Sequence, residues 1–238
     1  MKRLPAPDWV EDILTRAVDA GNLLRFGRHC PRKFQLLYCA PKAIRQRVLL
    51  YRKRRKPAAP APPQRALHGR FGRLQVIRAG DWDREGFDWT DHTVFRAAGQ
   101  RIHDGVPWSA TGDYRRLLRI LAERGEYEGC RTQADIDRRL AGWDAMIDEI
   151  RRSGRMRPRS ALNPGNFRER GGIEVAIGRD GDILFAGSGY HRLSVAWHLD
   201  LPAIPVCVVL VHREAVISGR FRALAEKSAR LQAPHGPA

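Results

Sequence analysis

The segment that most constrains the fold is 181–212, because strand, turn and helix signals follow one another within it. Ile183 to Phe185 comes directly after an Asp-Gly turn, which is a strong hairpin signal. The stretch 173–177 before that turn alternates as a half-buried strand does. Apolar residues at helical spacing predict a helix that begins near His191, and the β-branched run 206–211 predicts a buried strand. The segment therefore predicts a mixed α+β fold.

The turn that leads into this helix has the composition of an anion site. Gly187 and Gly189 allow the backbone to turn sharply, and Arg192 adds a charge at the expected exposed start of the helix. A glycine turn before a helix N-terminus offers free N–H groups and the positive end of the helix dipole. An alternative is a plain connection that needs glycine only for its geometry. The predicted phosphate-binding residues are Gly187, Ser188, Gly189, Tyr190, His191 and Arg192.

The motif Gly-x-His-Arg-Leu-x-x-Ala begins at Gly189, and Leu-x-Leu-Pro-x-Ile-Pro-Val-x-Val follows it from Leu199. Together they resemble the ParB/sulfiredoxin superfamily over residues 172–213. The resemblance implies a small mixed sheet with packed helices, in which this turn holds nucleotide phosphates. The superfamily includes partition proteins that bind CTP, sulfiredoxins that use ATP, and kinases of free serine.

Two departures from the family pattern make two of these activities unexpected, those of a sulfiredoxin and of a complete partition protein. Tyr190 stands where sulfiredoxins have a cysteine, so thiol chemistry at this position is not expected. Only residues 214–238 follow the motif, which we expect to be too few for the helix-turn-helix domain of a partition protein.

The resemblance implies a nucleoside triphosphate or diphosphate as cofactor, with Mg²⁺ if phosphate is transferred. Transfer would require a base for the acceptor hydroxyl and a ligand for the metal. Glu174 and Asp180 are the candidate catalytic residues, and Asp182 and Asp83 are further carboxylates to consider. Each of them is equally typical of a solvated strand or turn. The four cysteines are scattered, so neither a zinc site nor a disulfide framework is expected.

The net charge of +17 is concentrated near the N-terminus, since residues 1–80 carry +15 of it. The five consecutive cations Arg52, Lys53, Arg54, Arg55 and Lys56 end a helix predicted over 42–56. Such a run contacts nucleic-acid phosphates, or it is a solvated helix end that keeps the chain soluble. The Pro-rich stretch that follows predicts a semi-rigid spacer.

These observations divide the chain into four predicted parts. They are a helical basic extension at 1–56, a Pro-rich linker at 57–69, a ParB/sulfiredoxin-like domain at 70–213, and a C-terminal helix and tail at 214–238. No apolar stretch approaches the about 20 residues that cross a membrane, and no apolar signal core begins the chain. A cytoplasmic protein without a membrane partner is therefore expected.

The sequence is compatible with three classes of function, and nucleotide binding through the turn is the property expected of the first two. The first class is a nucleotide-dependent phosphotransferase acting on a small molecule. The second is a nucleic-acid-associated nucleotide switch that uses the basic run. The third is a non-catalytic interaction protein on the same scaffold, which need not bind nucleotide at all.

Overall fold

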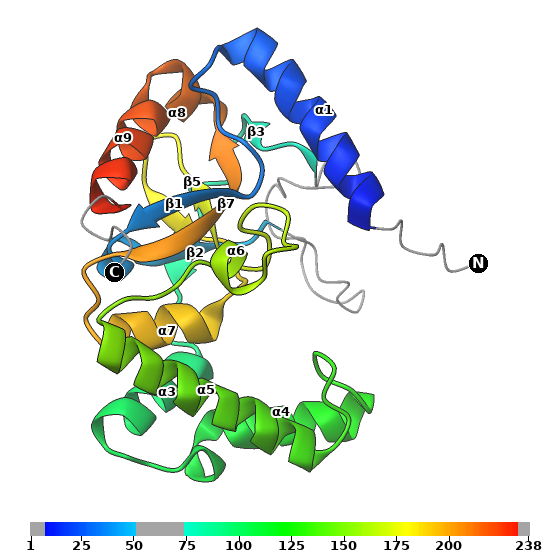
Figure 1. Ribbon diagram of the computed structural model, residues 1–238, viewed down its shortest axis with the longest axis vertical. Coiled ribbons are helices and arrows are strands. Elements are labelled where there is room, and N and C mark those ends of the chain that lie inside the picture. Colours follow the sequence, from blue (N-terminus) through cyan, green and yellow to red (C-terminus); the bar gives the residue numbers. More distant parts are fainter. Residues whose placement is uncertain (1–7, 51–73, 233–238) are drawn as a thin grey trace.

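Strand β7 (Ile204–His212) pairs with three other strands of the sheet in the computed structural model, which describes residues 8–50 and 74–232 (Figure 1). All nine residues of β7 are buried, as its β-branched run predicts. Strand β5 (Ile173–Ile177) pairs with β7 in parallel, and β1 (Gln35–Cys39) pairs with it antiparallel. The described part of the chain is therefore α+β with a mixed sheet.

The sheet has seven strands in the described residues, in the order β1-β7-β5-β6-β2-β4, and β3 also pairs with β7. Its remaining strands are β2 (Gln46–Val48), β3 (Ile77–Arg78), β4 (Gly86–Asp88) and β6 (Ile183–Phe185). Strand β6 forms the predicted hairpin with β5, and β2 adds to the other edge of β6 in parallel. The sheet is open, because β1 and β4 form its two ends.

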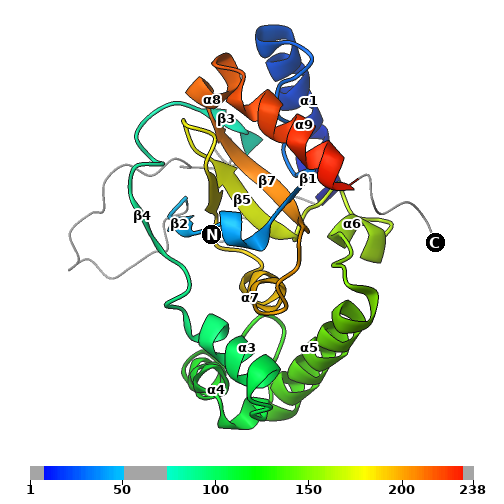
Figure 2. The same ribbon diagram turned by 90° about the vertical axis from the view of Figure 1, so that its left-hand side faces the viewer.

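Helices cover both faces of the sheet. Helices α1 and α9 lie on opposite sides of β1 and β7, and α7 lies between the sheet and α3, α4 and α5 (Figures 1 and 2). No helix of the described ranges is long and apolar enough to cross a membrane. The eight helices there are α1 (Asp8–Phe26), α3 (Thr93–His103), α4 (Gly112–Arg124), α5 (Gln133–Ser153), α6 (Arg159–Leu162), α7 (Tyr190–His198), α8 (Arg213–Ile217) and α9 (Arg220–Gln232).

The local capping signals explain where the helices begin and end. The Thr132 side chain accepts the N–H of Asp135, and the Asp135 carboxylate accepts the N–H of Thr132, so the two residues form a capping box at the start of α5. Gly154 ends this helix with a φ of +65°. These boundaries follow from interactions within a few residues of each helix end.

The helix predicted over 42–56 is wrong for residues 42–50. A short 3₁₀ turn (Pro41–Ala43) and strand β2 occupy this stretch, and the N-terminal strand β1 was not predicted at all. Residues 35–39 and 46–48 of the predicted basic extension are thus built into the same sheet as β7. Residues 51–56 and the predicted linker at 57–69 lie outside the described residues. The predicted C-terminal helix is present as α8 and α9.

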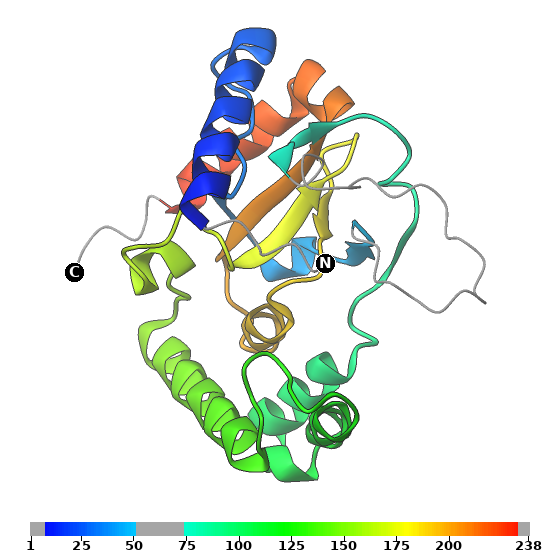
Figure 3. The ribbon, with the colours of Figure 1, turned by 90° about the vertical axis from the view of Figure 1, so that its right-hand side faces the viewer.

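Helix α1 lies on the outside of the molecule (Figure 3). It contacts the body through its polar side. Asp19 is almost fully buried and pairs with Arg168 at 2.5 Å, and Asp12 pairs with Arg170. The opposite side of the helix exposes apolar side chains, with Trp9 64% and Leu24 89% accessible. Charge pairing, and not apolar burial, therefore sets the orientation of α1.

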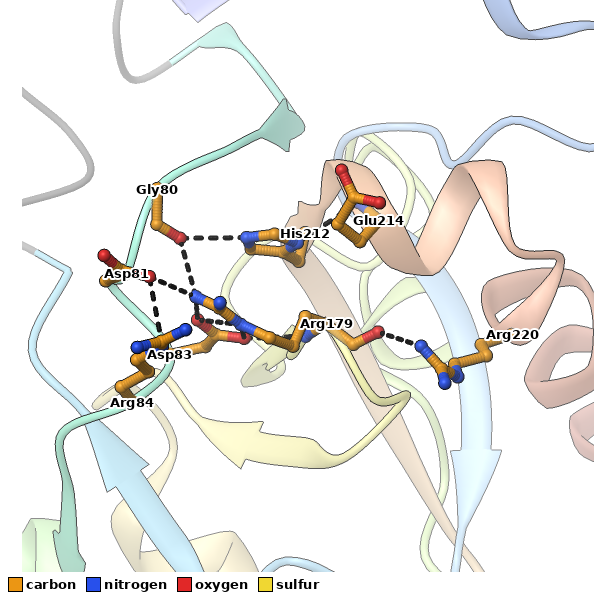
Figure 4. A network of polar contacts seen from close by, with 8 residues as sticks. All are labelled: Gly80, Asp81, Asp83, Arg84, Arg179, His212, Glu214 and Arg220. Carbon is orange, nitrogen blue, oxygen red and sulfur yellow. Dashed lines mark hydrogen bonds and ion pairs between the residues drawn. The ribbon is translucent and has the colours of Figure 1, made fainter.

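An arginine in the β5–β6 hairpin fixes the loop that precedes β4 (Figure 4). Arg179 donates from Nε and Nη2 to the Asp83 carboxylate at 2.7–3.2 Å, and it also contacts Asp81 at 2.8 Å. The Gly80 carbonyl accepts from Arg179 and lies 2.8 Å from Nε2 of His212. Asp83, one of the carboxylates considered for Mg²⁺, is thus committed to a structural ion pair.

We expect Asp83→Ala to lower the free energy of unfolding by about 3 kcal/mol, because it leaves the Arg179 guanidinium without its buried partner. The Asp83 side chain is 4% exposed, whereas that of Asp81 is 52% exposed. Asp81→Ala is therefore the matched control and should cost less than about 1 kcal/mol. Denaturant unfolding of both variants measures the difference, and equal losses would contradict this role for Asp83.

Candidate phosphate-binding site

The turn between β6 and α7 has the sharp backbone that its glycines predict. Gly187 and Gly189 have φ values of +102° and +90°. A Cβ atom at Gly189 would lie 2.8 Å from Cα of Ile173 and 3.1 Å from the carbonyl oxygen of Gly172. Only glycine fits this close approach, so the start of α7 is pressed against the backbone that enters β5.

The turn leaves a row of backbone donors free. The carbonyl oxygen of Ser188 accepts the N–H of Glu174 at 3.0 Å, and that of Gly189 accepts the N–H of Leu193. None of the six N–H groups of residues 187–192 donates to an acceptor in the described part of the chain. Consecutive free N–H groups at glycines with positive φ form a concave anion-binding arrangement, and the helix dipole adds to its positive potential.

Arg47 supplies a positive charge beside this turn, and sequence reasoning missed it. Its Nη1 donates to the Tyr190 hydroxyl at 2.6 Å, and its guanidinium lies 5.2 Å from the ring centroids of both Phe87 and Tyr190. A Cβ atom at Gly187 would be 3.1 Å from Nη2 of Arg47. Its Nε is buried without an acceptor, and no carboxylate of the described chain pairs with it. The parallel register of Arg47 with Phe185 brings it here.

The side chain of Tyr190 packs beneath the turn. Its ring meets Phe185 at 4.6 Å between centroids and stacks on His92 at 4.1 Å. Burial raises the pKa of Tyr190, so the phenol stays protonated near neutral pH. The position that carries a cysteine in sulfiredoxins is therefore occupied by a packed aromatic ring.

His191 contributes its backbone to the turn, while its ring points elsewhere. The ring packs against Trp143 of α5 at 3.2 Å between centroids, and Nε2 lies 3.5 Å from Oδ2 of Asp113 on α4. Burial, reinforced by nearby arginines such as Arg139, holds the pKa of His191 well below its usual range. The imidazole is therefore neutral at pH 7. Because its ring contacts Trp143 and Asp113, the structure does not bring this side chain to the predicted phosphate position.

The sequence predicts that Arg192 lies at an exposed helix start, but in the structure part of its guanidinium is buried. Its side chain is half-buried, and its Nη2 donates to the carbonyl oxygen of Arg157. Burial lowers the pKa of Arg192 from its usual value. Its Nε and Nη1 are buried and meet no acceptor within the described ranges. The guanidinium of Arg192 is therefore directed toward Arg157, whereas that of Arg47 lies against the Tyr190 hydroxyl and Gly187.

The two candidate catalytic carboxylates lie in different places. Glu174 is joined to the turn by its backbone, because its carbonyl oxygen accepts the N–H of Ala186 at 2.8 Å. Its side chain projects to the sheet face of Cys207, its register partner on β7. Asp180 lies at the other end of the β5–β6 hairpin, is 67% exposed and pairs with Arg220 at 3.3 Å. The structure therefore places Glu174 beside the turn and Asp180 away from it.

The cations Arg52, Lys53, Arg54, Arg55 and Lys56, predicted to contact nucleic acid, lie outside the described residues. Across residues 8–50 and 74–232, no group of three or more His, Cys, Asp or Glu side chains is arranged to hold a metal ion.

A buried lysine lies on the same sheet face as Glu174. Lys33 is 2% exposed, and its Nζ donates to the carbonyl oxygen of Val209 at 2.5 Å. Burial lowers the pKa of Lys33 to about 8, although the charge of Glu174 partly opposes this effect. Burial likewise raises the pKa of Glu174, against the charge of Lys33. The fold therefore holds the ionisable side chains of Lys33 and Glu174 largely away from water.

We expect the stability of the wild type to rise with pH relative to Lys33→Met. The pKa of about 8 in the folded state lies below the ordinary 10.5, so folding is penalised while Lys33 is charged. That penalty is complete below pH 8 and disappears as the pH approaches 10.5, a change on the order of 3 kcal/mol. Denaturant unfolding of both proteins from pH 7 to 10.5 tests this, and parallel pH profiles would refute it.

Comparison with known proteins gives this chain no relative, because no protein-family model, no curated protein and no solved structure matches it. The resemblance to the ParB/sulfiredoxin superfamily rests on the motif between Gly189 and Val208 and stays a prediction.

Proposed function

We propose that the chain binds a nucleotide and that the turn at 187–192 receives its phosphate groups. Six N–H groups of the turn lie beside the Arg47 guanidinium, and within residues 8–50 and 74–232 the N–H groups have no acceptor and Arg47 has no carboxylate partner. This arrangement is the observation that carries the proposal. A phosphate group meets the needs of both, since it accepts several hydrogen bonds and carries negative charge.

The environment of the turn favours an anion over a neutral ligand. Every residue of 187–192 is half-buried, so contacts made there are less screened than contacts on an open surface. Arg192 of the turn and Arg47 of β2 beside it each have a buried Nε without an acceptor in the described chain. A half-buried group of donors with this charge is costly when empty, and a bound oxyanion would compensate it.

Two features favour a nucleotide over inorganic phosphate. The motif from Gly189 resembles a superfamily in which this turn holds nucleotide phosphates. In addition, the Phe87 ring is 42% exposed and lies next to Arg47, where it offers an aromatic surface to a base or ribose. We limit the proposal to binding, because the side chain of Glu174 is on the other face of β5 and Asp180 lies at the far end of the hairpin.

A thermal-shift panel of ATP, ADP, CTP, GTP and inorganic phosphate, with and without Mg²⁺, tests the proposal on the whole chain. We expect at least one nucleotide to stabilise the protein more than inorganic phosphate does. Arg47→Met should then weaken binding of that nucleotide tenfold or more in calorimetric titration, because a charge-assisted contact contributes about 1.5–3 kcal/mol.

The matched control is Arg45→Met, because Arg45 is exposed and lies two residues before Arg47. This variant should keep the wild-type affinity. Ser188→Glu should abolish binding, since its carboxylate would compete for the free N–H groups. Unchanged affinity in Arg47→Met would place the nucleotide elsewhere, and no stabilisation by any nucleotide would end the proposal.

A further inference from the structure

We propose that a second, independent site binds an organic anion with an apolar body in a groove between α9, β1 and the loop 27–32. The groove has a volume of about 610 Å³. Helix α9 lies beside β1, the end strand of the sheet, and forms one wall (Figure 2). A volume of this size is within the range of small-molecule sites. The site shares no residue with the turn at 187–192.

Apolar side chains form the floor of the groove. Leu36 of β1 contributes from the strand, and Phe221, Ala225 and Ala229 contribute from one face of α9, four residues apart. Phe221 is 2% exposed and belongs to the hydrophobic core, so this floor is continuous with the interior. Such a surface favours a ligand that has apolar area to bury.

Arginines with unused donors surround this floor. Arg28 and Arg32 are exposed, and the Arg32 guanidinium makes no hydrogen bond or ion pair with any described residue. Within the described residues, the Arg28 side chain makes one hydrogen bond, from its Nε to Nε2 of His29 at 3.1 Å. Arg168 also lines the groove, but Asp19 and the Lys33 carbonyl occupy its Nη1. The free positive charge is therefore that of Arg28 and Arg32.

The two acidic residues of the groove differ in their availability. Both Glu169 oxygens accept hydrogen bonds at the start of α6, from the N–H groups of Arg159 at 2.6 Å and Ser160 at 3.0 Å. Glu226 accepts from Nε of Arg222 at 2.8 Å, and this contact lowers the pKa of Glu226. Glu226 thus neutralises the third arginine of the rim, in the place where a ligand oxyanion would compete with it.

The ligand class follows from this distribution of charge. A carboxylate, a phosphate monoester or a sulfonate would accept from Arg28 and Arg32, while an apolar body would cover the floor. Inorganic phosphate offers only the charge. Phenyl phosphate is therefore a suitable probe of the class, with benzoate to distinguish a carboxylate from a phosphate as the preferred group.

The test is a calorimetric titration of the full chain with phenyl phosphate, benzoate and inorganic phosphate at low salt. We expect phenyl phosphate or benzoate to bind at least fivefold more tightly than inorganic phosphate. Arg32→Ala should weaken that binding at least fivefold. Glu226→Gln should strengthen it severalfold, because it releases Arg222, and a gain in affinity does not arise from misfolding.

Two controls separate this site from other arginines. Arg213→Ala, an exposed position on α8 outside the groove, should leave the affinity unchanged, as should Arg47→Met at the turn. The proposal is overturned if neither organic anion binds more tightly than inorganic phosphate, or if Arg32→Ala and Glu226→Gln both keep the wild-type affinity. Loss of phenyl phosphate binding in Arg47→Met alone would assign the anion to the turn and also reject the groove.

Discussion

The candidate site depends on the close packing of Gly189 against the start of β5. Since a Cβ atom there would lie 2.8 Å from Cα of Ile173, the backbone of the turn is held at a distance that only glycine allows. Ile173 is in turn fixed by its register with Val206 on the buried strand β7. The sheet therefore sets where α7 begins, and the hydrogen bonds from Glu174 and Leu193 engage the carbonyl oxygens of the turn. The N–H groups of the turn are held in place by this packing and have no acceptor among the described residues.

Elements whose signals are local were predictable from the sequence, and elements that depend on distant partners were not. The strands at 173–177, 183–185 and 204–212 and the capping box of α5 follow from periodicity and turn residues. The apolar spacing in the predicted helix at 42–56 fits a strand as well as a helix. Residues 46–48 form a strand because β2 pairs with β6, some 140 residues away in sequence. The same is true of β1, whose partner is β7.

The backbone of the site was easier to predict than its side chains. Two glycines are sufficient to indicate a turn with free N–H groups, but the direction of His191 depends on Trp143 and Asp113 from other helices. Net charge was similarly uninformative about individual cations. Among the described residues of the basic N-terminal third, Lys33 is buried, Arg47 lies between aromatic rings and Arg32 is exposed in a groove. A composition count treats these three environments as one.

The segment 157–170 contacts the start of α7, the residue before β1, and α1, although it contains only one short helix. The Arg157 carbonyl accepts from Arg192 behind the turn, and the N–H of Glu169 donates to the Phe34 carbonyl next to β1. Arg168 and Arg170 pair with the two aspartates that orient α1. Because these contacts are polar and partly buried, their energy depends on geometry more than on area. Residues 157–170 thus link the start of α7, the residue before β1, and α1 through hydrogen bonds and ion pairs of defined direction. Apolar packing alone would leave the relative positions of these elements less defined.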